Sequence, residues 1–236
     1  MVEPWPKERI EALLRSEDYS YQRIELPHGL MTPGKARAAS AAQIFPDDLT
    51  GKTVLDLGCN HGFFCFEAVK RGAARVVGID YSPEIIRRAK LLAEAMGVTV
   101  EFEVRDINHQ PITERFDYVL CLNLLHHLDD PLLQLDRLMR AADERLVLEV
   151  AGVSLFDYVR RLEVMPLFGF LMGAFPVIYV ARVAAKRDAP AKLKYYFTRK
   201  AMRRLFAFRS DLYPTVEFPR SPHKGRYLVI AHRRRG

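Results

Sequence analysis

The central part of the chain alternates short apolar runs with longer stretches whose apolar residues recur at helical spacing. The short runs predict strands over 53–57, 75–80, 99–105, 118–122 and 145–150. The helical spacing predicts helices over 62–71, 83–96 and 131–141. Strands that alternate with helices in this way indicate a parallel sheet with right-handed crossovers. We therefore expect a doubly wound, mostly parallel, Rossmann-like α/β sheet.

The pattern is less regular on either side of this core. Residues 3–17 predict a short amphipathic helix, and residues 20–44 predict a loop followed by another helix. After residue 150 the alternation breaks, and only 226–232 again has the plain apolar pattern of a strand. The regular αβ core is thus expected between residues 51 and 150.

Polar residues end or interrupt the predicted strands at the same edge of the sheet. Asp56 lies inside the first apolar run, where a buried carboxylate is costly unless a partner needs it. The polar residues at this edge are Asp56, Asp80, Asp106 and Asn123, with His126 and His127 after Asn123. Ligands of open parallel sheets bind outside the carboxyl ends of the strands, so the pattern predicts a ligand site there.

The turn after the first strand narrows the class of ligand. Gly58, Asn60 and Gly62 all tolerate a positive φ or a close approach to the backbone. A dinucleotide fingerprint that starts at Gly58 needs glycines at 60 and 63, where this chain has Asn60 and Phe63. An acid at Asp56 would also repel phosphates. A ligand with a positive charge near Asp56 and a ribose near Asp80 fits better.

Four motifs in this order resemble the class I S-adenosylmethionine-dependent methyltransferases. They are "VLDLGCNHG", "VVGIDYS", "VRDI" and "FDYVLCLNLLHHLDDP", and the resemblance covers about residues 53–150. It implies a seven-stranded sheet with a C-terminal antiparallel strand and a helical lid insertion. It also implies an enzyme that transfers a methyl group by in-line displacement, with S-adenosyl-L-methionine as cofactor and no metal.

The resemblance also implies roles for individual residues. Asp56 would help to position the methionine end of the cofactor, Asp80 would bind both ribose hydroxyls, and Asp106 would bind the adenine amino group. Asn123 would face the methionine moiety or the substrate. The full set of predicted cofactor-binding residues is Asp56, Gly58, Cys59, Asn60, Gly62, Asp80, Tyr81, Asp106, Ile107 and Asn123. Asn60 stands where the family usually has its middle glycine, and we expect the turn to survive because Asn tolerates a left-handed conformation.

His127 and His126 are the candidate catalytic residues. They follow the fourth strand, where a general base would reach an acceptor that must lose a proton. The alternative is that either histidine makes only a structural hydrogen bond in a loop. The methyl donor is already activated, so positioning alone contributes ~7–11 kcal/mol to lowering the barrier.

The resemblance divides the chain into four segments. These are an N-terminal segment that packs on the cofactor site, the cofactor-binding core, a lid that sets acceptor specificity, and a C-terminal helix with the final strands; their bounds are 1–50, 51–150, 151–197 and 198–236. The last segment is expected to contain a helix in "FTRKAMRRLFA" and an antiparallel pair over 211–218 and 226–232.

The acceptor is the least determined part of the prediction. Residues 164–181 carry no charge, but Pro166 and Pro176 interrupt the stretch. Three interpretations remain open: a hydrophobic lid over an apolar pocket, an element at the surface of an anionic membrane, or a buried dimer or core helix pair. The first favours a small hydrophobic or lipid-like acceptor.

Positive charge is concentrated near the C-terminus, and it supports RNA as a second class of acceptor. Residues 182–236 contain 16 Lys and Arg against 3 Asp and Glu, within a chain of formal net charge +7. Such asymmetry indicates an anionic partner, either RNA or an anionic membrane surface, or else a solvated helix face with a frayed tail. A tRNA-modifying methyltransferase would use the interleaved aromatics as stacking platforms: Tyr195, Tyr196, Phe197, Phe206 and Phe208.

Two further expectations concern the whole chain. Cys59, Cys65 and Cys121 lie inside apolar stretches without metal-ligand spacing, which fits a reducing cytoplasm, with membrane association if the surface interpretation holds. A non-catalytic cofactor-binding subunit is the third functional class, although the intact acids at 56, 80 and 106 argue against a decayed site. The oligomeric state is left undetermined.

Overall fold

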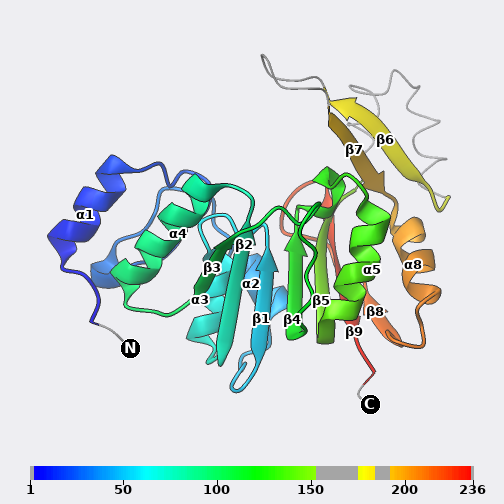
Figure 1. Ribbon diagram of the computed structural model, residues 1–236, viewed down its shortest axis with the longest axis horizontal. Coiled ribbons are helices and arrows are strands. Elements are labelled where there is room, and N and C mark those ends of the chain that lie inside the picture. Colours follow the sequence, from blue (N-terminus) through cyan, green and yellow to red (C-terminus); the bar gives the residue numbers. More distant parts are fainter. Residues whose placement is uncertain (1–2, 153–174, 184–191, 235–236) are drawn as a thin grey trace. The chain divides into compact units, whose positions relative to one another are not determined.

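The computed structural model describes residues 3–152, 175–183 and 192–234, and these form two compact units. The first unit contains residues 1–111 and 116–120, and the second contains 112–115 and 121–236. Figure 1 labels the helices and strands of both units.

The first unit holds the N-terminal helices and the first βα repeats. Its elements are α1 (Lys7–Ser16), η1 (Pro27–Gly29), α2 (Ala38–Ile44), β1 (Thr53–Leu57), α3 (Phe63–Lys70), β2 (Arg75–Asp80), α4 (Pro83–Met96) and β3 (Glu101–Val104). Strand β1 pairs in parallel with β2, and β2 pairs in parallel with β3. Strand β4 (Phe116–Leu122) begins in this unit.

The second unit holds the remaining elements. They are η2 (Leu125–His127), α5 (Pro131–Ala141), β5 (Ala142–Ala151), β6 (Ile178–Val183), β7 (Lys192–Phe197), α8 (Arg199–Ala207), β8 (Thr215–Glu217) and β9 (Arg226–His232). Strand β9 is antiparallel to both β5 and β8. Strands β6 and β7 form a separate antiparallel pair.

The seven-stranded sheet has the strand order β3-β2-β1-β4-β5-β9-β8. The predicted α/β class, the parallel strands and the C-terminal antiparallel strand are therefore confirmed. The predicted bounds of β1, β2, α4, α5 and β9 match the structure, whereas β3 and β8 are shorter than predicted.

Local capping explains why two helix boundaries were predictable. The Ser82 hydroxyl accepts a hydrogen bond from the Ile85 N–H at 3.4 Å, Pro83 opens α4, and Gly97 ends it at φ 67°. At α5 the Asp130 carboxylate accepts from the Leu133 N–H at 3.0 Å. Both caps are encoded within a few residues of the helix that they begin or end.

Charged pairs and a backbone hydrogen bond join the N-terminal segment to α4, and Figure 1 shows α1 beside that helix. The Glu17 carboxylate accepts hydrogen bonds from Arg87 at 2.6 Å and from Arg88 at 2.9 Å. The Trp5 N–H donates to the Ala95 carbonyl at 3.0 Å. Because these contacts bridge distant parts of the sequence, they fix the start of the chain on the first unit.

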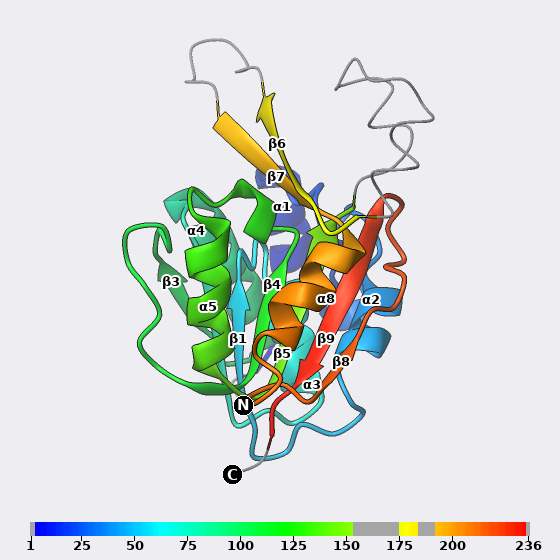
Figure 2. The ribbon, with the colours of Figure 1, turned by 90° about the vertical axis from the view of Figure 1, so that its right-hand side faces the viewer.

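Residues 153–174 and 184–191 of the predicted helical lid lie outside the described residues, and the described part of that segment contains the antiparallel strands β6 and β7. Strands β6 and β7 pair from Ile178 with Phe197 to Val183 with Lys192, and Figure 2 shows this strand pair beyond the end of β5 and the start of β9. Both strands alternate side chains along "IYVARV" and "KLKYYF", and their β-branched and aromatic residues favour strands. Residues 164–174 of the uncharged stretch lie outside the described residues.

Within the described residues, no helix is both long enough and apolar enough to cross a bilayer. The described end of the uncharged stretch enters β6, and its Phe175 is 55% exposed.

Candidate functional site

The turn between β1 and α3 has the backbone conformation that its residues permit. Gly58, Asn60 and Gly62 have φ values of 71°, 51° and 90°. The Asn60 side chain stabilises its own left-handed conformation by accepting a hydrogen bond from the His61 N–H at 2.8 Å. The turn therefore forms with Asn60 in the position of the usual middle glycine.

Glycine is required at position 62 for a second reason. A Cβ atom there would lie 2.7 Å from Cζ of Phe102, which is closer than real Cβ contacts. Gly62 also precedes the first residue of α3, so its close approach lets the helix start directly on the sheet. The backbone N–H groups of this turn and helix start lie at the tip of β1, where an open sheet binds its ligand.

Asp80 links the tip of β2 to this turn. Its Oδ2 accepts a hydrogen bond from the Asn60 N–H at 3.2 Å, and its Oδ1 accepts from the Ser82 N–H at 3.1 Å. Burial raises the pKa of Asp80, and the backbone hydrogen bonds from Ser82, Asn60 and Tyr81 oppose that rise. Each carboxylate oxygen has a further lone pair, so the group can still accept hydrogen bonds from ligand hydroxyls.

Asp56 is buried within β1, with 1% of its surface exposed. Its Oδ2 accepts a weak hydrogen bond from the Cys65 thiol at 3.7 Å. Burial raises its pKa to about 7, the Cys65 hydrogen bond opposes the rise, and the charge of Asp80 adds to it. A carboxyl group poised in this way becomes fully ionised when a cation binds next to it.

The loop after β3 brings the third acid to the same sheet edge. The Arg105 N–H donates to the Asp80 carbonyl at 3.0 Å, which places Asp106 next to the tip of β2. The Asp106 carboxylate accepts from the Asn108 N–H at 3.0 Å, and Ile107 is buried. Tyr81 is 74% exposed after β2. The first unit thus holds its predicted site residues, from Asp56 to Ile107, on three adjacent strand ends.

Gln22 is a site residue that the sequence did not indicate. Its side chain is buried against the turn, where Nε2 donates to the Cys59 carbonyl at 3.5 Å and Oε1 accepts from the Phe63 N–H at 3.3 Å. Gly34 allows this approach, because a Cβ there would lie 2.3 Å from the Gln22 backbone nitrogen. The N-terminal segment therefore buttresses the turn through one amide, and only a spatial contact identifies it.

His61 lies inside the turn motif and is 4% exposed. Its ring packs edge-on against Tyr19 with centroids 5.1 Å apart, and its Nδ1 has no hydrogen-bond partner among the described residues. Burial and the positive charge of Arg88 lower its pKa to about 4. His61 is thus a neutral packing residue that connects the turn with the N-terminal segment.

Asn123 stands at the end of β4, where the second unit begins its own set of polar residues. Its backbone has φ 58°, and its N–H donates to the Glu149 carbonyl at 2.9 Å. Glu149 is 4% exposed, and its carboxylate accepts from Ser221 at 2.5 Å and from Arg226 at 2.9 Å. One buried residue on β5 therefore connects the tip of β4 with the loop between β8 and β9.

The two candidate catalytic histidines have different environments. His126 is 1% exposed, whereas His127 is exposed, and their ring centroids are 4.1 Å apart. Burial, followed by the positive charges nearby, lowers the pKa of His126 to about 2. Loss of water around the ring, with the charges of Lys194, Arg226 and Lys192, lowers the pKa of His127 to about 4. Of the two, only His127 is open to a substrate in this conformation.

This combination of fold and strand-end acids is the arrangement expected of a methyltransferase domain. A family model described as a methyltransferase domain matches residues 48–176, which is more than half of the chain. The chain belongs to this methyltransferase domain family, as the four motifs predicted.

Two curated relatives that match this domain are named for different reactions. The chain is 28% identical over 141 residues to a tRNA U34 carboxymethyltransferase of Campylobacter hominis, which covers 58% of this chain and 44% of that protein. It is 36% identical over 89 residues to a ubiquinone biosynthesis O-methyltransferase of Nitrobacter winogradskyi, which covers 38% and 34%. The matches span less than half the length of these relatives.

A solved structure matches nearly the whole chain. The N-terminal domain of EvdMO1, crystallised in the presence of SAH and D-fucose, superposes with a TM-score of 0.69 at 16% identity. The match covers 98% of both chains. At this level of identity the likeness concerns the fold alone.

Proposed function

We propose that this chain is an enzyme that transfers a methyl group from S-adenosylmethionine to a small organic acceptor with an apolar body. The observation that carries the proposal is the set of three acids at adjacent strand ends of the first unit, Asp56, Asp80 and Asp106, beside a turn with left-handed residues at 58, 60 and 62. Family membership supports the reaction class.

The cofactor assignment rests on the chemistry of these residues. Asp80 offers lone pairs to the ribose hydroxyls, Asp106 accepts from the adenine amino group next to buried Ile107, and Asp56 faces the cationic methionine end. SAH, which EvdMO1 and other neighbours were crystallised with, is the product that S-adenosylmethionine leaves after methyl transfer. The turn from Gly58 to Gly62, held by Gln22, would lie beneath the cofactor.

The protein's contribution to the reaction would be mainly positional. The sulfonium already activates the methyl carbon, so holding donor and acceptor in line supplies most of the acceleration. In this mechanism the acceptor atom attacks the methyl carbon, the carbon–sulfur bond breaks, and the bonding electrons pass to sulfur. His127 would take a proton from the acceptor if the acceptor carries one, because its pKa of about 4 leaves the imidazole neutral and able to accept at pH 7.

The burial of most of the C-terminal aromatic side chains favours a small acceptor over RNA. Phe197, Phe206 and Tyr196 are buried with 0%, 1% and 9% exposure, and Tyr195 is half-buried and donates to the Asp129 carbonyl at 3.2 Å. Among the five aromatics considered as stacking platforms, Phe208 alone is fully open to solvent, at 87% exposure. RNA keeps the support of the basic charge and of the tRNA-modifying relative, and it is the second candidate.

The experiment begins with calorimetric binding of S-adenosylmethionine to the full chain. Asp80→Ala should weaken binding by about tenfold or more, because hydrogen bonds to a charged group contribute ~1.5–3 kcal/mol. Asp47→Ala is the matched control, since it removes an exposed acid from the same unit. Unchanged affinity in Asp80→Ala would remove the ribose assignment.

Turnover separates an enzyme from a non-catalytic subunit. The wild-type chain is incubated with S-adenosylmethionine, with SAH release measured across small apolar acceptors and transfer RNA. SAH release that requires a small acceptor supports the proposal. Tight cofactor binding with release only on transfer RNA would favour the second candidate, and binding without any release would favour a cofactor-binding subunit.

A further inference from the structure

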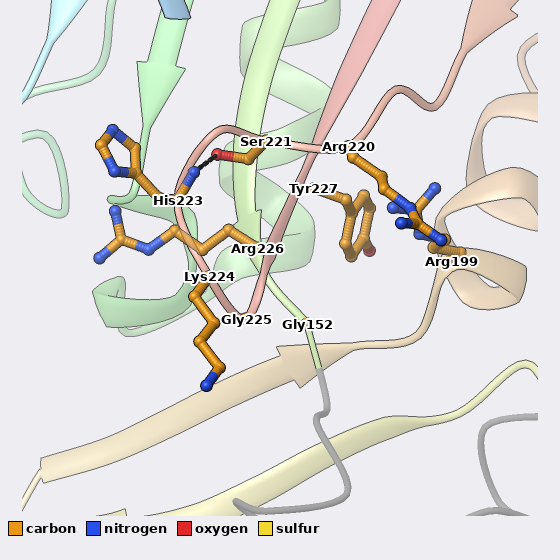
Figure 3. Close-up of a pocket in the computed structure, with 9 residues that line it drawn as sticks. All are labelled: Gly152, Arg199, Arg220, Ser221, His223, Lys224, Gly225, Arg226 and Tyr227. Carbon is orange, nitrogen blue, oxygen red and sulfur yellow. Dashed lines mark hydrogen bonds between the residues drawn. The ribbon is translucent and has the colours of Figure 1, made fainter.

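A cavity of about 320 Å³ lies in the second unit, beyond the carboxyl end of β5. Its walls are Gly152, the start of α8 and the loop that leads from β8 into β9. In Figure 3, Arg199 and Arg220 lie on one side next to Tyr227, and Lys224 and Arg226 lie on the other. No acidic side chain is among the residues that line the cavity.

Among the described residues, most cations of this cavity have no acidic partner. In the part of the chain that the structure describes, no acid forms an ion pair with Arg199, Arg220 or Lys224. Arg226 differs, because it is paired with buried Glu149 at 2.9 Å. Clustered cations without counter-charges repel one another, and a bound anion would relieve that repulsion.

Arg199 is held in a fixed orientation, and its guanidinium has further N–H donors available for a ligand. Its Nη1 donates to the Phe218 carbonyl at 2.7 Å, and its guanidinium lies 5.0 Å from the ring centroid of Tyr227. Burial and the charges of Arg220 and Arg203 lower its pKa. A guanidinium has five N–H donors in a planar fork, a geometry that matches carboxylate and phosphate oxygens.

The loop that carries the other cations is also preorganised. The Ser221 hydroxyl donates to Glu149 and accepts from the His223 N–H at 3.0 Å, while the Arg226 N–H donates to the His223 carbonyl at 3.3 Å. Gly225 closes this turn at φ 77°, and its carbonyl accepts from the Gly152 N–H at 3.0 Å. A loop fixed at both ends loses little entropy when it binds an anion.

The cavity is connected to the tip of β4 through Glu149. The Glu149 carbonyl accepts from the Asn123 N–H, and its carboxylate holds Ser221 and Arg226 of the cavity loop. The charge of Arg226 also acts on His126 and His127. The cavity and the candidate acceptor side of the second unit are therefore neighbours at the same end of the strands.

We propose that this cavity binds an anionic group, a phosphate or a carboxylate, carried by the small acceptor. The inference rests on the proposed function and makes it more specific, because it gives the apolar acceptor a charged end. Arg199, Arg220 and Lys224 bind the anion, while Glu149 positions the loop. A cavity of about 320 Å³ suits one anionic group of a small molecule better than the repeated phosphates of an RNA strand.

The first test measures binding of inorganic phosphate to the full chain at constant ionic strength. Calorimetry with phosphate, and with acetate as the carboxylate probe, should give saturable binding, and thermal unfolding should shift upward with either ligand. Arg220→Gln and Lys224→Gln should each weaken binding of the preferred anion by about tenfold. Arg204→Gln, which removes an exposed cation from α8 outside the cavity, should leave binding unchanged.

Two outcomes would overturn the proposal. One is that neither anion binds saturably to the wild-type chain, and the other is that Arg204→Gln weakens binding as much as both cavity variants do. Circular dichroism and S-adenosylmethionine binding check that the variants fold. If one cavity variant does not fold, the other is enough to test the proposal. Since phosphate binding is measured without cofactor or turnover, failure here leaves the cofactor assignment standing, and failure of cofactor binding leaves the anion site standing.

The salt dependence separates a single anion from an RNA backbone. A small acceptor with one anionic group should bind with a slope of log affinity against log salt near −1, and both cavity variants should lower its affinity. A steep slope on transfer RNA that becomes shallower in Arg220→Gln, with no saturable binding of a small anion that depends on the cavity, would show that the cavity holds backbone phosphates and would overturn the proposal.

Discussion

The Asp80 carboxylate accepts a hydrogen bond from the Asn60 N–H at 3.2 Å, which ties the tip of β2 to the turn after β1. The same group is the predicted ribose ligand. It shapes the turn and, in the proposed function, would also bind the ribose, so the effect of replacing it would combine two losses. Substitutions at Asn60 test the shape of the turn separately.

Asn60→Gly should be nearly neutral, whereas Asn60→Ala should destabilise the fold by about 1–2 kcal/mol, because alanine is strained at φ 51°. Glycine loses the hydrogen bond to the His61 N–H but keeps the conformation. Chemical denaturation and S-adenosylmethionine binding should follow the same order. Equal stability of the glycine and alanine variants would contradict the role given to this backbone conformation.

Gln22→Ala should loosen the N-terminal segment and weaken cofactor binding. It removes the partners of the Cys59 carbonyl and the Phe63 N–H, and a buried polar group left unsatisfied costs about 1–3 kcal/mol. Gly34→Ala should have a similar effect, because its Cβ would meet the Gln22 backbone at 2.3 Å. Limited proteolysis reports the release of the segment, and exposed Gln43→Ala is the control. Protection equal to wild type in both variants would exclude the buttress.

Asp56 should make cofactor binding pH-dependent. Its pKa in the folded chain is raised to about 7, so stability associated with this group is present at low pH and is lost as pH rises from about 4 through 7. Asp56→Asn should therefore be more stable than wild type above pH 7 when no cofactor is bound. Thermal unfolding at pH 5 and pH 8 measures the difference.

The same residue predicts the opposite trend for binding. A cationic ligand needs the ionised carboxylate, so affinity should fall by up to about tenfold for each pH unit below 7. Calorimetry in buffers of different ionisation enthalpy counts the released proton. Asp56→Asn should bind weakly with little pH dependence, and a wild-type profile that is flat from pH 5.5 to 8 would remove Asp56 from the cationic end of the cofactor.

His61 should sensitise the fold to acid. Its pKa is lowered to about 4, below the ordinary value of 6.5, so the stability it contributes is present above pH 6.5 and is lost as pH falls toward 4. His61→Phe keeps a ring against Tyr19 and should reduce the loss over this range by up to about 1.4 kcal/mol for each pH unit. His109→Gln, an exposed histidine of the same unit, should behave as wild type. An acid profile unchanged by His61→Phe would contradict the prediction.

His127→Ala should lower kcat by about 10²–10⁴-fold if the acceptor loses a proton to this residue. The pH–rate profile of the wild type should then rise near pH 4, and Lys194→Gln should move that limb upward by removing a nearby positive charge. His126→Gln should affect stability more than kcat, because that ring is buried. Wild-type kcat in His127→Ala would mean that positioning alone suffices.

Local sequence determined the regular part of the fold. The helix that begins at Ser82 and the one that begins at Asp130 carry their caps within three residues, so their starts were predictable without any knowledge of the packing. The acids at 56, 80 and 106 were recognisable because each interrupts or ends an apolar strand. The alternation of strands and helices then predicted a parallel sheet with right-handed crossovers, a rule that depends on handedness rather than on particular side chains.

Tertiary structure decided what distant residues share. Gln22 gained its role only when the chain placed it against Cys59, 37 residues away, and Glu149 joined Ser221 and Arg226 across more than 70 residues. The C-terminal aromatics alternate with basic residues, a pattern that suits either stacking on RNA bases or burial in the core. In the structure most of them are buried. The pairing of β6 with β7 and the basic cavity also depend on contacts between distant residues. Contacts of this kind depend on which surfaces meet after folding, whereas periodicity and capping act within a few neighbouring residues.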